Sequence, residues 1–86
     1  MIAASDRAKL VGRNIAIARK LAGMSQKQLA QIVGVPSSYV SDWEHGKHEP
    51  RARNFGLLVE ALDQHWSWYY RDHSEDDDDE PDEQAA

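Results

Sequence analysis

The polar residues that follow Pro36 have the types and the spacing to make hydrogen bonds from one side of a helix. They are Ser37, Ser38, Ser41, Asp42 and His45. Tyr39, Val40 and Trp43 recur between them at three-to-four spacing and fall on the opposite side. A hydroxyl group donates and accepts hydrogen bonds, and a carboxylate accepts them. The pattern therefore predicts a short helix that packs through one side, makes contacts through the other, and ends at Gly46.

Residue arrangements typical of catalysis are missing from the sequence. It contains no Gly-rich phosphate loop, nucleophile elbow or paired-His metal helix. The lack of cysteine excludes disulfides, thiolate metal sites and a cysteine nucleophile. His45 and His48 straddle Gly46, which favours loop positions over metal ligation, and the run 76–79 lacks the glycine of a calcium loop. We therefore expect no enzyme activity, no metal and no cofactor.

A second short helix is predicted just before the first, from the residues at its two ends. Ser25 can cap its start, and Gln28 can reach back to complete a capping box. Gly34 follows at a position where a left-handed residue closes a helix at little cost. One side is apolar, with Leu29, Ala30 and Val33. Residues 25–46 thus predict two short helices joined by a tight turn.

This stretch resembles the helix-turn-helix of the Cro/C1-type repressor family, also called the Xre family. The resemblance is carried by Ser25-Gln26, Leu29-Ala30, Gly34-Val35, Val40-Ser41 and Glu44-x-Gly46-Lys47 with Pro50 behind it, and it extends from about Gly12 to Tyr70. It implies an all-α fold, a compact bundle of about five short helices of the lambda-repressor-like type. It also implies a sequence-specific transcriptional regulator of double-stranded DNA, a small phage or bacterial repressor, with the helix over 37–45 in the major groove.

By position in the motif, the resemblance implies two sets of DNA contacts and one structural ion pair. The residues expected to read bases are Ser37, Ser38, Ser41, Asp42 and Gln26. The residues expected to bind phosphate are Gln26, Lys27, Lys47, Arg51 and Arg53. Arg19 and Glu44 match the positions of a buried or half-buried pair in the family, which we interpret as structural, although two solvated surface charges are the alternative.

Two departures from the family pattern bear on the strength of binding. The exposed side of the second helix has no Arg, Lys, Asn or Gln, so the bidentate contacts to guanine or adenine are missing from it. Pro36 stands where relatives often have a Ser or Thr cap, which removes a side-chain acceptor. Each monomer is therefore expected to read few bases. Useful affinity then needs two copies with recognition helices about 34 Å apart, or a partner that adds contacts.

Two flanking helices are predicted to complete the core. The first runs from about Ser5 or Asp6 to Ala22, with Val11, Ile15, Ala18 and Ala22 on one stripe. The other runs from about Arg51 to Leu62, with Ala52, Phe55, Leu58, Val59 and Leu62 on its inner side.

A short aromatic helix is predicted over 65–71, and its rings have two alternative roles. In one, Trp68 fills the bottom of the helical core. A domain of about seventy residues has little interior, and contiguous exposed aromatics usually mark a contact surface. We therefore expect a homodimer interface that includes some of Trp66, Tyr69 and Tyr70.

Charge divides the chain into a helix-turn-helix DNA-binding domain, residues 1–72, and an acidic tail, residues 73–86. The formal charge is −5, but residues 75–86 hold eight of the fifteen acids and no base. Ten Lys and Arg against the seven remaining acids leave +3 on residues 1–74. The tail is expected to be disordered. It either only solvates the chain, or folds back over the basic face and competes with DNA, or binds a protein partner.

Two further expectations concern location and an alternative job. The chain has no 18-residue apolar run and no apolar core of a signal peptide near its start, so we expect a cytoplasmic protein that does not span a membrane. The alternative keeps the fold but changes the function, since fold does not imply function. It is a protein-interaction module, such as an antitoxin of a toxin-antitoxin pair or a phage-encoded factor, whose DNA binding is autoregulatory or partner-dependent.

Overall fold

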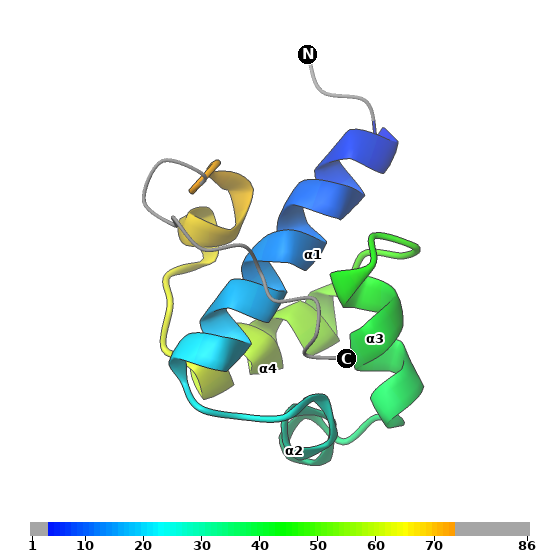
Figure 1. Cartoon of the computed structure of the whole chain (residues 1–86), viewed down its shortest axis with the longest axis vertical. Coiled ribbons are helices and arrows are strands. Elements are labelled where there is room, and N and C mark those ends of the chain that lie inside the picture. The colour runs from blue at the N-terminus through cyan, green and yellow to red at the C-terminus, as the bar shows by residue number, and fades with distance from the viewer. Residues whose placement is uncertain (1–3, 74–86) are drawn as a thin grey trace.

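Four α-helices and one 3₁₀ helix make up residues 4–73, which are the residues that this computed structural model describes (Figure 1). The helices are α1 (Ala4–Leu21), α2 (Gln26–Val33), α3 (Ser37–Glu44), α4 (Ala52–Leu62) and the 3₁₀ helix η1 (Trp66–Tyr70). No strand occurs within residues 4–73, so the all-α expectation is confirmed. The tail that we expect to be disordered is residues 73–86. Of these, residues 74–86 lie outside the described part of the chain.

The joint between α2 and α3 forms as the sequence predicts. The Ser25 hydroxyl accepts from the Gln28 amide at 3.0 Å, and the Gln28 side chain accepts from the Ser25 amide at 2.8 Å, which completes the capping box. Gly34 is left-handed, with φ of 87°, and its amide donates to the Ala30 carbonyl at 2.7 Å. Pro36 is the N-cap residue of α3 and, having no side-chain acceptor, makes no capping hydrogen bond. The capping box and the left-handed glycine set where α2 begins and ends.

The core gathers apolar residues from every helix. It consists of Val11, Ile15, Ala18, Leu29, Ala30, Val33, Val40, Trp43, Leu58, Leu62 and Tyr69. Helix α1 crosses the others, with α3 packed on one side of it and η1 on another (Figure 1). Gly12 allows the close approach of α3, because a Cβ atom at this position would lie 2.0 Å from the Trp43 carbonyl oxygen. Helix α3 is therefore held directly against the backbone of α1.

Three residues that were expected to face the core are exposed instead. Ala22 lies outside because α1 ends at Leu21, one residue earlier than predicted. Ala52 is exposed because it is the first residue of α4, where the helix has not yet reached the core. Tyr39 is 50% exposed and lies edge-on to Trp43, with the ring centroids 6.4 Å apart. The three-to-four spacing thus marked the edge of the apolar side as well as its centre.

Tyr69, and not Trp68, fills the core at the C-terminal end. Tyr69 is fully buried, packs edge-to-face on Phe55 at 5.4 Å, and has the pKa of its phenol raised by burial to about 12. The buried Asn14 side chain donates two hydrogen bonds of 2.8 Å, to the Tyr69 and Arg71 carbonyls. The expectation that Tyr69 takes part in a dimer interface is therefore wrong, because its ring is enclosed by its own chain.

The folded part of the chain reaches His73, one residue beyond the expected boundary. The His73 imidazole stacks on Trp68, with centroids 4.1 Å apart and planes at 26°, and only 8% of the residue is exposed. Its Nε2 lies 2.8 Å from the Trp68 carbonyl oxygen. This packing covers one face of Trp68, which is half-buried. His73 therefore belongs to the domain and not to the tail.

Candidate nucleic-acid interface

The N-terminal half of α3 presents polar side chains to the outside. Ser37 and Ser38 are exposed, while Ser41 and Asp42 are half-buried farther along the same helix. Val40 and Trp43, on the other side of the helix, are buried in the core. The Asp42 carboxylate lies 3.9 Å from the Lys47 ammonium group. The structure thus brings four of the five predicted base-reading residues onto one short helix, with a cation beside its acidic residue.

A buried ionic network fixes α3 to α1 and α2. Arg19 of α1 donates to both carboxylate oxygens of Glu44, from Nε at 2.6 Å and from Nη2 at 3.1 Å. The predicted pair is therefore confirmed, and it is buried, because the two side chains are 9% and 6% exposed. Gln26 also donates to Glu44 at 2.8 Å, and Arg19 Nη1 donates to the Met24 carbonyl at 2.8 Å. The end of α3, the start of α2 and the end of α1 are joined at one carboxylate.

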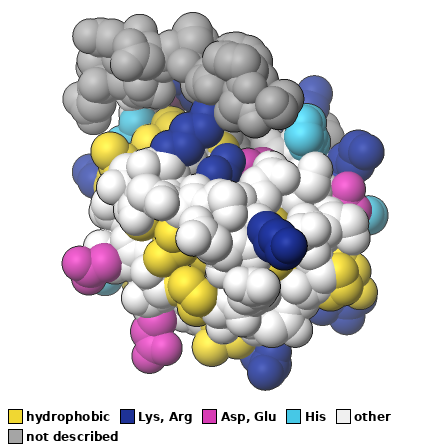
Figure 2. Space-filling view, turned by 60° about the horizontal axis from the view of Figure 1, so that its bottom comes forward, with side chains coloured by type: hydrophobic (Ala, Val, Ile, Leu, Met, Phe, Trp, Pro, Cys, Tyr) yellow, Lys and Arg dark blue, Asp and Glu magenta, His cyan; other side chains and the backbone are white. Residues whose placement is uncertain are grey.

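The predicted phosphate-binding cations lie on the surface at separate points. Lys27, Lys47, Arg51 and Arg53 are all exposed. Lys27 belongs to the first turn of α2, and the other three follow α3 into the first turn of α4. Figure 2 shows the side of the molecule around α2, where Lys and Arg side chains are scattered with exposed hydrophobic groups between them. The positive charges are therefore spread over this surface, an arrangement in which each cation contacts a different phosphate group.

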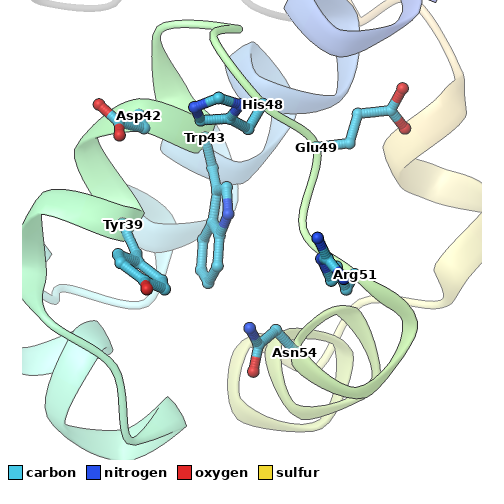
Figure 3. Close-up of a pocket in the computed structure, with 7 residues that line it drawn as sticks. All are labelled: Tyr39, Asp42, Trp43, His48, Glu49, Arg51 and Asn54. Carbon is cyan, nitrogen blue, oxygen red and sulfur yellow. The ribbon is translucent and has the colours of Figure 1, made fainter.

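A cleft of about 500 Å³ separates α3 from the start of α4 (Figure 3). It is lined by Tyr39, Asp42, Trp43, His48, Glu49, Arg51 and Asn54. The edges of Tyr39 and Trp43 form its wall on α3, and Arg51 and Asn54 form the wall on α4. Sequence reasoning did not select Tyr39, His48 or Asn54 as contact residues. Only the position of Tyr39 at the edge of the apolar side could have indicated that it lies on the surface.

His45 closes the C-terminal end of α3. Its Nδ1 lies 2.8 Å from the Ser41 carbonyl oxygen, so this nitrogen carries the proton and donates. Within residues 4–73 no group of His, Cys, Asp and Glu side chains could hold a metal ion. This geometry agrees with the interpretation of His45 as a loop residue.

The fold and this surface define a helix-turn-helix DNA-binding domain. A family model described as helix-turn-helix matches residues 15–69, and the chain belongs to this family, which is of the Cro/C1 type. The match covers the end of α1, both motif helices, α4 and most of η1, and the resemblance seen in the sequence is confirmed. The chain is therefore a DNA-binding transcriptional regulator.

A solved structure of a regulator of the same kind is similar to this chain. It is the crystal structure of the restriction-modification controller protein C.AhdI from Aeromonas hydrophila. The two chains are 28% identical and superpose with a TM-score of 0.68, over 73% of this chain and 96% of that one. A comparison with curated proteins gave no match. None of the helices within residues 4–73 has the length and apolar character to cross a membrane.

Proposed function

We propose that this regulator is sequence-specific, that it inserts α3 into the major groove, and that it binds a two-fold operator as a homodimer. The observation that supports this proposal is the exposed, polar N-terminal half of α3, held rigidly by the buried Arg19–Glu44–Gln26 network. A helix that reads base edges must keep its angle to the domain, and a buried bidentate ion pair restricts that angle. The role we assign to it is that of a small phage or bacterial repressor.

We assign the DNA contacts by the position of each residue in the helix-turn-helix motif, and the exposure of Ser37, Ser38 and the cations supports this assignment. Ser37, Ser38, Ser41 and Asp42 read bases, the serines with either base and Asp42 by accepting from a cytosine amino group. Gln26 stands at the start of α2 and contacts a phosphate or a base beside the groove. The remaining phosphate contacts come from Lys27, Lys47, Arg51 and Arg53. The Asp42–Lys47 contact of 3.9 Å holds this lysine next to the recognition helix.

The homodimer is needed because one α3 offers few base contacts. Trp66 is 56% exposed and Tyr70 40% exposed, and their rings meet edge-to-face at 6.2 Å. Tyr70 also packs on Phe55 at 5.9 Å, so the two exposed rings stand on a fixed base. Exposed aromatic groups held in this way are favourable centres of a protein interface. We assign the dimer surface to Trp66 and Tyr70.

A second function is favoured by one specific observation. The exposed side of α3 has neither Arg, Lys, Asn nor Gln, and Asp42 repels phosphates. A chain of this kind could choose its site only with the help of a protein partner, as an antitoxin or a phage-encoded factor would, and its acidic tail could contact that partner. The likeness to a restriction-modification controller protein favours the first function, because a controller protein has a regulatory role.

Selection of random duplex DNA on the purified full-length protein, at two salt concentrations, separates the two functions. A two-fold symmetric motif that survives the higher salt is the expected result, because base contacts depend less on salt than phosphate contacts do. A salt-sensitive pool without a motif would contradict the first proposal and favour the partner-dependent function.

Variants then test the residue roles. Replacing Ser37, Ser38 and Asp42 together should change the preferred sequence. Replacing Lys47 and Arg51 with Gln should weaken binding to all sequences and lower the salt slope by about one per lost contact. An unchanged preference in the triple variant would mean that α3 is not the recognition helix.

A further inference from the structure

We propose that the outer side of α1 is a docking surface for the acidic segment of the same chain, residues 75–83. The surface consists of Lys9, Arg13 and Lys20, named here the basic stripe of α1. The proposal does not rest on the DNA contacts assigned above, because the stripe lies on a different helix. It gives a binding site to the acidic segment, which takes no part in the helix-turn-helix.

The basic stripe follows from the period of α1. Successive residues advance by about 100° around an α-helix, so positions 9, 13 and 20 fall within an arc of about 40°. The buried residues Val11, Ile15 and Ala18 lie on the opposite side of the helix. The three cations therefore lie on the side of α1 away from these core residues, with Lys9 next to the loop at Gly46. Asp6, the one acid of α1, lies on the same side in the first turn.

Arg13 is the residue of the stripe that most needs a partner. Its side chain is half-buried, and its Nε is buried without a hydrogen-bond acceptor among the residues that the structure describes. An N–H donor of a guanidinium group without water or an acceptor is unfavourable, and a carboxylate is the acceptor that fits the guanidinium fork best. Arg13 thus marks the middle of the stripe as a place for an acidic group.

The described part of the chain reaches α1 shortly before the acidic segment. Asn14, the neighbour of Arg13, donates at 2.8 Å to the carbonyl of Arg71, so the backbone at 71 touches the middle of α1. His73 is the last described residue and is fixed on Trp68. Figure 1 shows this end of the described chain beside α1. Glu75 is only four residues after Arg71, so the first carboxylate is at most about 14 Å of extended chain from that residue.

Length and charge suit the stripe as well. An extended chain spans about 3.3 Å per residue, so 75–83 covers about 30 Å, whereas positions 9 to 20 of a helix span about 16 Å. The segment carries eight carboxylates and faces three cations. A tethered segment of this kind has an effective concentration in the millimolar range, so weak charge pairs suffice for docking.

The DNA-contacting surface is the competing place for this segment, and it fits less well. Its cations are dispersed, Lys47 already lies 3.9 Å from Asp42, and α3 itself presents no cation. Docking on α1 uses cations other than those assigned to phosphate contacts, so the segment does not compete with DNA for them.

Paramagnetic NMR on the full-length protein tests the proposal. Because the chain has no cysteine, Ala85→Cys provides a single site for a nitroxide label. Amide signals of residues 9–20 should broaden more than those of 37–44 at low salt. The broadening should vanish near 1 M salt, where the Debye length is about 3 Å. Labelled protein mixed with unlabelled, isotope-enriched protein should show no broadening, since the docking is within one chain.

Two matched variants identify the cations involved. Lys9→Gln, Arg13→Gln and Lys20→Gln together should abolish the broadening over 9–20, whereas Lys27→Gln, Arg51→Gln and Arg53→Gln together should leave it unchanged. Circular dichroism checks that both variants fold, and the salt dependence of the unaltered chain decides the matter if one does not. Broadening centred on 37–44, uniform weak broadening, or broadening in the mixed sample would each overturn the proposal. No DNA is present, so failure here is separate from failure of the proposed operator binding.

Discussion

Replacing Glu44 with Gln should destabilise the fold strongly, although the side chain keeps its shape. The carboxylate accepts three hydrogen bonds, two from Arg19 and one from Gln26, and it is 6% exposed. Its neutral amide keeps one acceptor oxygen but places an NH2 group, which cannot accept, where the second carboxylate oxygen was, so the Arg19 guanidinium, which is 9% exposed, loses one of its two hydrogen bonds to this residue together with the negative charge. The variant therefore retains a buried cation that has lost its counter-charge.

The expected cost follows from the burial of this pair. Removing one partner of a buried pair costs about 3–5 kcal/mol, because the other charge stays without compensation. A small domain has only about 5–15 kcal/mol in all, and each kcal/mol shifts the midpoint by about 4–8 °C. Glu44→Gln should thus lower the melting temperature by roughly 10 °C or more. Arg19→Met with Glu44→Met should recover most of the loss, since no charge is then left unpaired.

Urea unfolding followed by circular dichroism and tryptophan fluorescence measures these free energies. The matched control is Glu49→Gln, because Arg7 donates to Glu49 at 3.0 Å but these side chains are 54% and 26% exposed. This exposed pair should contribute at most about 1 kcal/mol. The reasoning would be refuted if Glu44→Gln cost as little as the control, or if the double variant were no more stable than the single one.

Three further outcomes are expected. Gly12→Ala should destabilise the fold by about 1–3 kcal/mol or more, because its methyl group would meet the backbone of α3. Gly56→Ala should instead stabilise the fold by about 0.5–1 kcal/mol, because a methyl group there would have nothing within 4 Å and alanine favours a helix. Thermal unfolding compares the two variants. Trp66→Ala with Tyr70→Ala should give a folded monomer by sedimentation, and a folded dimer would contradict the assigned interface. Folding raises the pKa of Tyr69 from 10.0 to about 12, so the unfolded chain loses this proton at lower pH than the folded chain does. The stability that comes from this shift is therefore complete below pH 10 and is lost as the pH rises toward 12. Urea unfolding between pH 10 and 12 should show a smaller loss of stability for Tyr69→Phe than for the unaltered chain.

The sequence by itself determined the local structure of the motif. Ser25, Gln28 and Gly34 fix the bounds of α2 through hydrogen bonds between residues three or four apart. Apolar spacing selected most of the buried residues, since one side of a helix shows its period in the sequence. The Arg19–Glu44 pair came from the family resemblance and not from spacing, because its partners are twenty-five residues apart.

Only the tertiary structure decided which aromatic ring enters the core and which stays outside. A 3₁₀ helix turns every three residues or so, and neighbouring rings in Trp66–Tyr70 are alike in hydrophobicity, so their order gives no direction. Asn14 decides it by binding the carbonyls of Tyr69 and Arg71, fifty-five and fifty-seven residues away along the chain. The same side chain holds the backbone at Arg71 against α1. Such placements depend on distant residues meeting in space, which no local pattern records.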